Sequence, residues 1–214
     1  MKILNLYACL GGNRYKWDEV TKVDVTAVEL DEELAKLYQE RFPNDKVVVA
    51  DAHQYLLDHY KEFDFIWTSP PCPTHSRARY WGFGRNGKKP VYPEMSLYQE
   101  IIFLKHHYDG KWCVENVTPY YEPLIPAVKK GRHLYWTNFT LPNILSERKI
   151  QIATGTNEVK KLCEFHNYDF YIYKGEQRIN KIARNLVDYE AGKTILETAL
   201  GIIRKQNQNQ LEMF

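Results

Sequence analysis

The chain has 214 residues, of which 44% are hydrophobic, which suits one globular domain with a small appendage and excludes a disordered protein. Its 29 basic and 27 acidic residues leave a formal net charge of only +2, so overall charge does not indicate a nucleic-acid-binding protein. The four cysteines form no Cys-x-x-Cys pair, and we find neither a secretory signal nor an apolar run of membrane-spanning length; we therefore expect a cytoplasmic protein with reduced thiols, no bound metal and no membrane contact.

Apolar runs and helical patterns alternate through the first half of the chain. The runs predict strands over residues 3–7, 23–29, 46–50, 63–68 and 111–115. The patterns between them predict helices over residues 31–41, 52–60 and 95–108. Because strands that alternate with helices build parallel sheets, we predict an α/β fold with a doubly wound, Rossmann-like sheet.

The other segments are less regular. Residues 77–93 are rich in glycine, proline and basic side chains, which predicts a mobile loop. Residues 132–139 predict a further strand, and residues 140–181 predict an irregular region. Apolar positions at helical spacing predict a last helix over residues 188–204.

Cys72 stands directly after the fourth predicted strand, in a Ser-Pro-Pro-Cys turn. Pro70 and Pro71 fix the backbone and cannot extend the sheet, so they hold the thiol at the strand end. Ligands of open α/β sheets bind at that edge, and a thiolate there is a strong nucleophile. We interpret Cys72 as a nucleophile in preference to an inert buried thiol, and expect Arg132 or a local dipole to lower its pKa.

A glycine turn and two acidic residues follow the first three predicted strands. Gly11 and Gly12 allow a ligand to approach the backbone closely, although such a turn is often only structural. Glu29 follows at a spacing that fits the ~20 residues expected for an acid that binds ribose hydroxyls. Asp51 is placed to meet an adenine amino group. The alternatives are helix N-caps, with Asp31 competing with Glu29 for one of them. The combination favours a nucleotide-like cofactor.

Polar residues also follow the fifth predicted strand. Glu115 is expected just past its end, where its carboxyl group would lie near Cys72 and bind a ring nitrogen of a substrate. Asn116 is placed to fix a loop, and the alternative for both residues is an ordinary polar turn. The basic residues 129–133, which include Arg132, suit contact with an anion or a carbonyl oxygen, or a solvated turn.

Taken in order, these motifs resemble the DNA cytosine-5 methyltransferase family. The family's phenylalanine–glycine cofactor loop matches Tyr7 with the glycine turn, and its strand-end glutamate matches Glu29. Its Pro-Cys loop, its Glu-Asn-Val triplet and its arginine-bearing strand match residues 71–72, 115–117 and Arg132. The segment Asn185-Leu186-Val187 looks like the closing segment that packs back on the cofactor site. Three positions depart from the pattern: Asn5 replaces an aspartate, and Cys9 and Arg184 replace glycines.

The resemblance implies a domain organisation. Residues 1–139 would form the catalytic methyltransferase domain, residues 140–182 a reduced target-recognition region, and residues 183–214 a C-terminal segment that returns to the catalytic domain. The middle region is much shorter than is usual in the family. We therefore expect sequence readout to be minimal or to be supplied by another protein chain. The compact form is similar to versions carried by phages and mobile elements.

The resemblance also implies an activity and its residues. It implies methyl transfer from S-adenosylmethionine to carbon 5 of cytosine in double-stranded DNA, with the base flipped out of the duplex. The implied catalytic residues are Cys72, which attacks carbon 6, Glu115, which binds ring nitrogen 3, and Arg132. The implied cofactor-binding residues are Tyr7, Ala8, Leu10, Gly11, Gly12, Glu29, Leu30, Asp51, Ala52, Pro70 and Asn185. The implied substrate-binding residues are Ser76, Arg77, Arg79, Asn116 and Val117.

We expect the loop over residues 77–93 to close on the flipped base. Its basic side chains would meet backbone phosphates, and its aromatic side chains would fill the vacated stack. The basic residues are Arg77, Arg79, Arg85, Lys88 and Lys89, and the aromatic residues are Tyr80, Trp81 and Phe83.

Three other functions compete with this one. Amino-methyltransferases also carry a Ser-Pro-Pro turn, but they follow it with tyrosine or tryptophan, whereas Cys72 stands here. An RNA cytosine-5 methyltransferase acting on tRNA would use the same chemistry. A catalytically inactive nucleic-acid-binding relative would explain the departures at Asn5 and Arg184, but the intact Cys72 and Glu115 argue against it.

Overall fold

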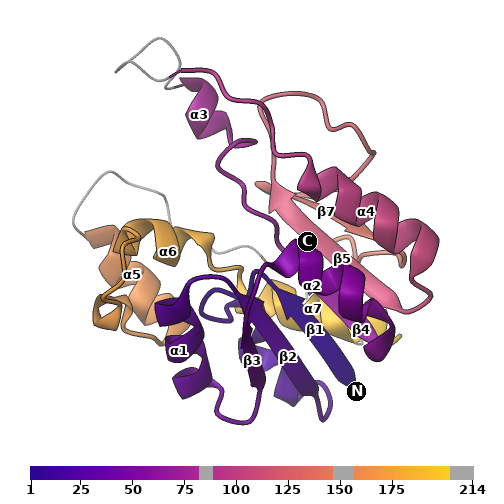
Figure 1. The fold of residues 1–214 in the computed structure, drawn as a ribbon, viewed down its shortest axis with the longest axis horizontal. Coiled ribbons are helices and arrows are strands. Elements are labelled where there is room, and N and C mark those ends of the chain that lie inside the picture. Colours follow the sequence, from indigo (N-terminus) through magenta and orange to yellow (C-terminus); the bar gives the residue numbers. More distant parts are fainter. Residues whose placement is uncertain (82–88, 147–156, 203–214) are drawn as a thin grey trace, which may run out of the picture.

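The computed structural model describes residues 1–81, 89–146 and 157–202, and these form a single seven-stranded sheet with helices on both faces (Figure 1). The strand order is β3-β2-β1-β4-β5-β7-β6. The first five strands are parallel, and β7 runs antiparallel to both β5 and β6. The strands are β1 (Lys2–Leu6), β2 (Asp24–Glu29), β3 (Lys46–Val49), β4 (Phe65–Thr68), β5 (Lys111–Val117), β6 (Val128–Lys130) and β7 (His133–Thr137).

The helices alternate with the parallel strands, so the predicted α/β, doubly wound fold is confirmed. The α-helices are α1 (Glu32–Arg41), α2 (Ala52–His59), α3 (Arg77–Trp81), α4 (Ser96–His107), α5 (Asn157–His166), α6 (Ile179–Asn185) and α7 (Tyr189–Ala199). The 3-10 helices are η1 (Asn13–Glu19), η2 (Tyr60–Glu62) and η3 (Phe170–Ile172). Strand order reverses between β1 and β4, and open α/β sheets bind ligands beside that reversal.

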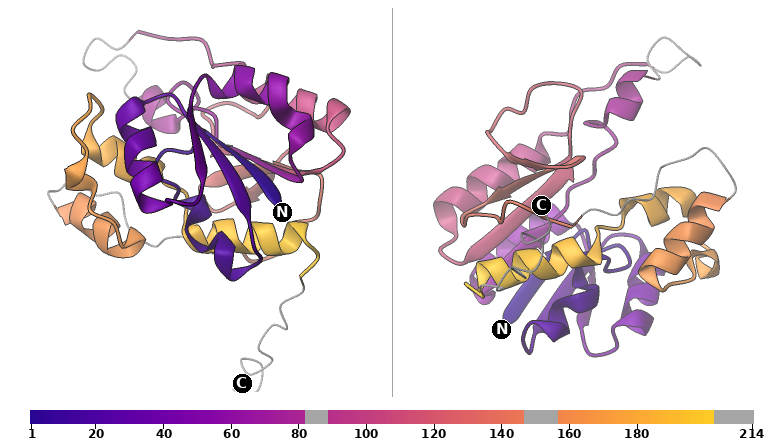
Figure 2. Two further views of the ribbon diagram at one scale, coloured as in Figure 1. Left: turned by 60° about the horizontal axis from the view of Figure 1, so that its bottom comes forward. Right: turned by 180° about the vertical axis from the view of Figure 1, so that it is seen from behind.

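Successive strand residues point into two different cores. Ile66 and Val114 pack with α2 and α4, whereas Trp67 and Cys113 pack with η1 and α7. This alternation is the period of two that a strand imposes, and both faces are apolar because both are covered. Figures 1 and 2 show α2 on one side of the sheet and α7 on the other. Every helix in the described ranges is too short or too polar to cross a membrane.

The helix α7, near the end of the chain, packs against η1, which lies near the start of the chain. Its N-cap is Asp188, whose carboxylate accepts from the amides of Glu190 and Ala191. Gly192 allows α7 to touch η1, because a Cβ there would lie 2.2 Å from the carbonyl oxygen of Asn13. Trp17 Nε1 also donates to the Gly192 carbonyl at 3.2 Å. The last segment of the chain therefore completes the core under β1.

The expectation of an irregular region over residues 140–181 is wrong for its second part. Here α5, η3 and α6 bury Leu162, Phe170 and Ile182 in a small core that they share with α1 and the glycine loop. With three and seven residues, η3 and α6 are too short to display a helical repeat, whereas the ten residues of α5 do carry an amphipathic pattern that the sequence analysis overlooked. Residues 147–156 of that region lie outside the described part of the chain, and the boundary expected at residues 182/183 falls inside α6.

Two further expectations need correction. The segment 77–93 begins as the helix α3, so its first five residues are not a loop; residues 82–88 lie outside the described ranges. Glu115, Asn116 and Val117 are the last residues of β5 and do not follow it. The strand is longer than its apolar run because β5 keeps pairing with β7, from Cys113↔Thr137 to Val117↔His133, after β4 has left the sheet.

Candidate active site

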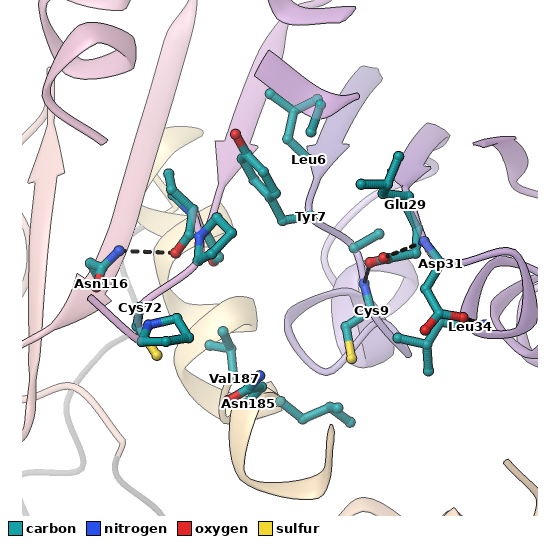
Figure 3. Close-up of a pocket in the computed structure, with 18 of the residues that line it drawn as sticks. Leu6, Tyr7, Cys9, Glu29, Asp31, Leu34, Cys72, Asn116, Asn185 and Val187 are labelled. Atoms are coloured by element: carbon teal, nitrogen blue, oxygen red, sulfur yellow. Dashed lines mark hydrogen bonds between the residues drawn. The ribbon is translucent and has the colours of Figure 1, made fainter. Parts of the chain in front are cut away.

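A cleft of about 1470 Å³ opens along the carboxyl ends of the parallel strands (Figure 3). Strand register explains why the motifs meet there, since Leu6 of β1 lies level with Val28 of β2 and Thr68 of β4. One end of the cleft, the glycine-loop end, is lined by residues that follow β1 and β2, including Tyr7, Cys9, Gly12 and residues 29–31. The other, the cysteine end, is lined by Cys72, Glu115, Arg132 and His133.

The turn that carries Cys72 is tied to the neighbouring strand. Asn116 Nδ2 donates to the carbonyl oxygen of Pro70 at 3.0 Å, and this amide is buried (Figure 3). The amides of His75 and Ser76 both donate to the Cys72 carbonyl at 3.0 Å, so the chain turns directly after the thiol. Asn116 therefore fixes the loop that carries Cys72, as expected from the sequence.

A buried histidine anchors the same turn from behind. The His75 ring is 1% exposed, and its Nδ1 lies 2.5 Å from the hydroxyl of Tyr121. Its carbonyl oxygen accepts from the amide of Tyr120 at 3.1 Å. Burial lowers the pKa of His75, so the ring is neutral at physiological pH. Sequence reasoning did not single out His75, although it stands in the motif itself.

The electrostatics of Cys72 differ from expectation. Burial of the thiol, and then the negative charge of Glu115, raise the pKa of Cys72 above its ordinary value. The positive charges of Lys181 and Arg132 act in the opposite direction without cancelling that effect. Arg132 thus acts on the pKa of Cys72 in the predicted direction, but the expected net lowering is wrong for the free protein, because desolvation and Glu115 outweigh the cations. The neutral thiol dominates at pH 7.

The three predicted catalytic residues line the same cleft. Glu115 is 7% exposed, and its Oε1 lies 3.6 Å from His133 Nε2 across the β5–β7 pair. Arg132 follows Gly131, whose φ of 54° makes the turn of the β6–β7 hairpin. The Arg132 carbonyl accepts from the Thr118 amide at 2.9 Å, which fixes the hairpin against the end of β5.

The backbone of the glycine loop is unusual at three positions. Tyr7, Cys9 and Gly11 have φ values of 56°, 46° and 67°, in the left-handed region that favours glycine. Cys9 stands where the resembled family carries glycine, and this conformation gives the physical reason for that preference. Gly12 has an ordinary φ of −58°, but a Cβ there would lie 2.5 Å from the Val187 carbonyl oxygen.

Two of the predicted cofactor residues do not line the cleft. Leu10 is fully buried in the core beneath α5 and α6, and a Cβ at Gly11 would meet the rings of Phe42 and Tyr38. Both residues shape the loop from behind, and their contact with a cofactor stays a prediction. The other predicted residues do line the cleft: Tyr7, Ala8, Gly12, Glu29, Leu30, Asp51, Ala52, Pro70 and Asn185.

Glu29 supports the loop from the end of β2. Its Oε2 accepts from the Cys9 amide at 2.8 Å and its Oε1 from the Asp31 amide at 3.0 Å (Figure 3). Burial raises the pKa of Glu29, and the backbone amides act against that rise. The alternative roles as helix caps are confirmed for Asp31 at α1 and for Asp51 at α2.

A buried carboxylate that sequence analysis missed lies below Tyr7. Glu100 is 0% exposed; its Oε1 accepts from the Tyr7 hydroxyl at 2.6 Å and its Oε2 from the Thr68 hydroxyl at 2.6 Å. His53 Nδ1, from the start of α2, lies 3.1 Å from the same Oε1. The signal was present, because Glu100 falls on the apolar face that Leu97, Ile101 and their helical neighbours define on α4.

The predicted substrate-binding residues divide into two groups. Ser76, Asn116 and Val117 line the cleft, and Arg77 and Arg79 do not. Arg77 Nε donates to the Pro119 carbonyl at 3.4 Å, and Arg79 donates to the Lys89 carbonyl at 3.3 Å. Both belong to α3, which Figure 1 shows at the edge of the molecule. The expected roles of Phe83, Arg85 and Lys88, and of the Tyr80 and Trp81 side chains, lie outside the described part of the structure.

A doubly wound sheet with a glycine loop and a strand-end acid at its switch point defines a Rossmann-like protein of the kind that binds nucleotide-like ligands. Among such proteins, the chain belongs to the C-5 cytosine-specific DNA methylase family, whose model matches residues 1–119. The predicted resemblance is thereby confirmed. None of the curated proteins compared with the chain matches it.

Solved structures similar to the chain include three relatives of larger size. DNMT2 of Spodoptera frugiperda, in a triple mutant, is 26% identical over 54% of this chain and 35% of its own, with a TM-score of 0.39. A candidate DNA modification methyltransferase from an Escherichia coli prophage is 17% identical over 57% and 34%, with a TM-score of 0.40. The Entamoeba histolytica methyltransferase EhMeth is 12% identical over 55% and 38%, with a TM-score of 0.37. The chain thus spans little more than a third of each relative's length.

Proposed function

We propose that the protein transfers a methyl group from S-adenosylmethionine to carbon 5 of cytosine in double-stranded DNA, through a covalent bond to Cys72. The observation that carries this proposal is that one cleft joins a thiol, a carboxyl group on the adjacent strand and a glycine loop with its strand-end acid. Membership of the C-5 cytosine-specific DNA methylase family supports the reaction type.

The glycine-loop end suits the methyl donor. S-adenosylmethionine, when bound, supplies an electrophilic methyl group on a sulfonium centre. Glu29 is placed to accept from ribose hydroxyls, and the exposed side chain of Leu30 offers an apolar surface to a purine ring. Because Gly12 has no Cβ, the glycine loop can lie close to the backbone of Val187 at this end of the cleft. The cleft exceeds the ~300–1000 Å³ of an ordinary small-ligand pocket, which leaves room for an extruded base beside the donor.

The cysteine end suits the pyrimidine. Cys72 Sγ, as the thiolate, would form a bond to carbon 6, and the electron pair of the 5,6 double bond would move to carbon 5. Glu115 would hold a proton at ring nitrogen 3, which makes carbon 6 more electrophilic. Carbon 5 would then form a bond to the methyl group of S-adenosylmethionine as the sulfur–methyl bond breaks and S-adenosylhomocysteine leaves. A base would next remove the proton on carbon 5. The electrons of that C–H bond then re-form the double bond, and Cys72 leaves as the thiolate.

The raised pKa of Cys72 adds a pH dependence to this scheme. The thiol must lose its proton before it attacks, and burial together with Glu115 opposes that loss. We therefore expect adduct formation to become faster as pH rises from 7 toward the raised pKa, until other groups titrate. A proton taken up from solvent and shared between Glu115 and ring nitrogen 3 would neutralise the carboxylate and so remove the second of the two opposing effects.

The decisive experiment replaces the thiol. Cys72→Ser should lower radiolabel transfer from S-adenosylmethionine to duplex DNA by at least about a thousandfold, since the covalent route is lost. Donor affinity should stay within twofold. Cys163→Ser is the matched control, because that cysteine lies outside the cleft. Full activity of Cys72→Ser would refute the nucleophile assignment.

Two companion measurements separate the competing functions. Duplex DNA that contains 5-fluorocytosine should trap the wild-type chain as a covalent adduct, which an inactive relative would not form. Transfer to tRNA instead of DNA would assign the activity to RNA.

The variant Glu115→Gln tests the role of the carboxyl group. It should slow the chemical step more than it weakens donor binding; the reverse result would place Glu115 in the donor site.

A further inference from the structure

The segment expected to read the target contains α5 and α6. Figures 1 and 2 show both helices beside α1, at the glycine-loop end of the cleft. Their shared core includes Leu10 of the glycine loop and Leu34 and Leu37 of α1. This region is therefore built onto the end of the cleft that suits the donor.

One carboxylate fastens the region to that end. Asp31 Oδ2 accepts from the Tyr173 hydroxyl at 2.8 Å and from Gln177 Nε2 at 2.9 Å, while its Oδ1 caps α1. Burial alone would raise the pKa of Asp31, but its hydrogen bonds, with that from Gln177 foremost, outweigh burial and lower it. Asp31 follows Leu30 and Glu29 directly, so the two donors also fix the position of the strand-end acid.

A cation makes a second attachment. Arg41 Nη1 donates to the carbonyl oxygen of Leu10 at 2.7 Å, and its Nη2 donates to the carbonyl oxygen of His166 at 2.9 Å. The guanidinium also lies 4.8 Å from the ring centre of Tyr168. Arg41 therefore joins the glycine loop to the end of α5 through one side chain.

The same region lines the cleft itself. Gly175, Glu176 and Gln177 line it together with Glu29 and Leu30, and Lys181 and Arg184 continue the wall toward Cys72. Arg184, which replaces a glycine of the family pattern, pairs with Glu158 at 2.7 and 2.6 Å. Glu158 is 6% exposed, so this pair locks α6 to α5. The arginine that replaces the family's glycine at position 184 therefore has a structural role, since its ion pair with Glu158 holds α6 against α5.

We propose that residues 175–184 form a wall of the adenosyl-donor site, that Gln177 and Tyr173 set donor affinity by holding Asp31, and that this short region serves donor binding in place of target recognition. This inference rests on the proposed function, because it needs an adenosyl ligand at the glycine-loop end. The ligand class it takes is an adenosine that carries a sulfur-linked amino acid.

Calorimetric titration of S-adenosylhomocysteine into the full chain tests this inference. We expect Gln177→Ala to weaken binding about tenfold, since one charge-assisted hydrogen bond is lost. Gln177→Glu should weaken it more, because a carboxylate would then face Asp31. Tyr173→Phe tests the second donor, and Tyr171→Phe is its control, because Asp31 accepts from the Tyr173 hydroxyl and not from that of Tyr171. Fluorescence anisotropy of labelled duplex DNA should stay within twofold of wild type for every variant.

Hydrogen exchange of the wild-type chain gives a readout that a merely structural role would not move. Amides of residues 173–184 should exchange more slowly once S-adenosylhomocysteine is added. Unchanged donor affinity in the Gln177 variants, or loss of DNA affinity with donor affinity intact, would overturn the inference. If either outcome is found while the wild-type chain binds S-adenosylhomocysteine and methylates DNA, the inference fails but the proposed function stands. Failure of the wild type to bind S-adenosylhomocysteine would instead refute both.

Discussion

The two ends of the cleft are built in different ways. At the glycine-loop end, Glu29 accepts from two backbone amides, and Asp31 accepts from two amides and two side chains. At the cysteine end, the turn is fixed by Asn116 and by His75, and the Glu115 carboxylate lies 3.6 Å from His133 across the β5–β7 pair. At one end, acids hold the backbone of a loop, whereas at the other a fixed turn carries a thiol beside a carboxylate.

This difference matches the demands of the two proposed ligands. A small cofactor is bound best by groups that are already in position, since binding then costs little ordering of the protein. An extruded base arrives attached to a polymer, and the residues that act on it must keep room for its entry. The comparison predicts that substitutions at the glycine-loop end will alter donor affinity and stability, and that those at the cysteine end will alter the rate of the chemical step.

The largest effect is expected at Gly12. Gly12→Ala would place a Cβ 2.5 Å from the Val187 carbonyl and 3.0 Å from Leu186 Cβ, so backbone must move. We expect a loss of about 2–3 kcal/mol in the free energy of unfolding, measured by urea denaturation, together with weaker donor binding. Gly201→Ala is the comparison, since its Cβ meets nothing within 4 Å and only its positive φ of 69° costs about 1–2 kcal/mol. A loss at Gly12 that does not exceed the loss at Gly201 would show that the contact with Val187 costs little.

A smaller effect is expected at Asn116, and on a different quantity. Asn116→Ala removes the hydrogen bond to Pro70 that aligns the Cys72 turn with β5. We expect the rate of methyl transfer to fall by the equivalent of about 1–2 kcal/mol in activation free energy. The affinity for S-adenosylhomocysteine, measured by calorimetry, should not change. A parallel loss of donor affinity would mean that the two ends of the cleft are coupled.

The smallest effect concerns His53 and its dependence on pH. The hydrogen bond that the His53 ring donates to the Glu100 carboxylate raises the pKa of His53 above 6.5, and Asp51 and Glu94 add negative charge nearby. The His53–Glu100 pair therefore contributes to the free energy of unfolding fully below pH 6.5, and this contribution is lost as pH rises through the raised pKa of His53. We expect His53→Asn to lower the free energy of unfolding by roughly 0.5 kcal/mol at pH 6 and hardly at all at pH 9.

Thermal or urea unfolding of the His53→Asn variant at both pH values measures this difference. The matched control is His59→Asn, whose ring lies on the same helix beside Glu62 at the protein surface. A destabilisation of His53→Asn that is larger at pH 9 than at pH 6 would contradict the assigned direction. Tyr7→Phe, which removes the other donor to Glu100, should act equally at both values because its hydroxyl does not titrate in this range.

Local chemistry determined much of this protein from its sequence alone. The alternation of apolar and polar residues located the parallel strands, because a strand repeats every two residues and a helix every 3.6. The prolines before Cys72 and the glycines after β1 located the cleft, because each restricts or frees its own backbone whatever surrounds it. Glu29 and Asp51 could be placed at strand ends for the same reason, although their role as caps or ligands could not be separated.

The tertiary structure decided what depends on distant residues. The pKa of Cys72 is raised by burial and by Glu115, which no local pattern of residues 69–76 contains. Glu115–Val117 became strand because β7 pairs with them from a later part of the chain. The region after residue 157 turned toward α1 through Asp31 and Arg41, more than a hundred residues before it. Burial, pairing and charge are properties of the packed chain, and sequence neighbours do not specify them.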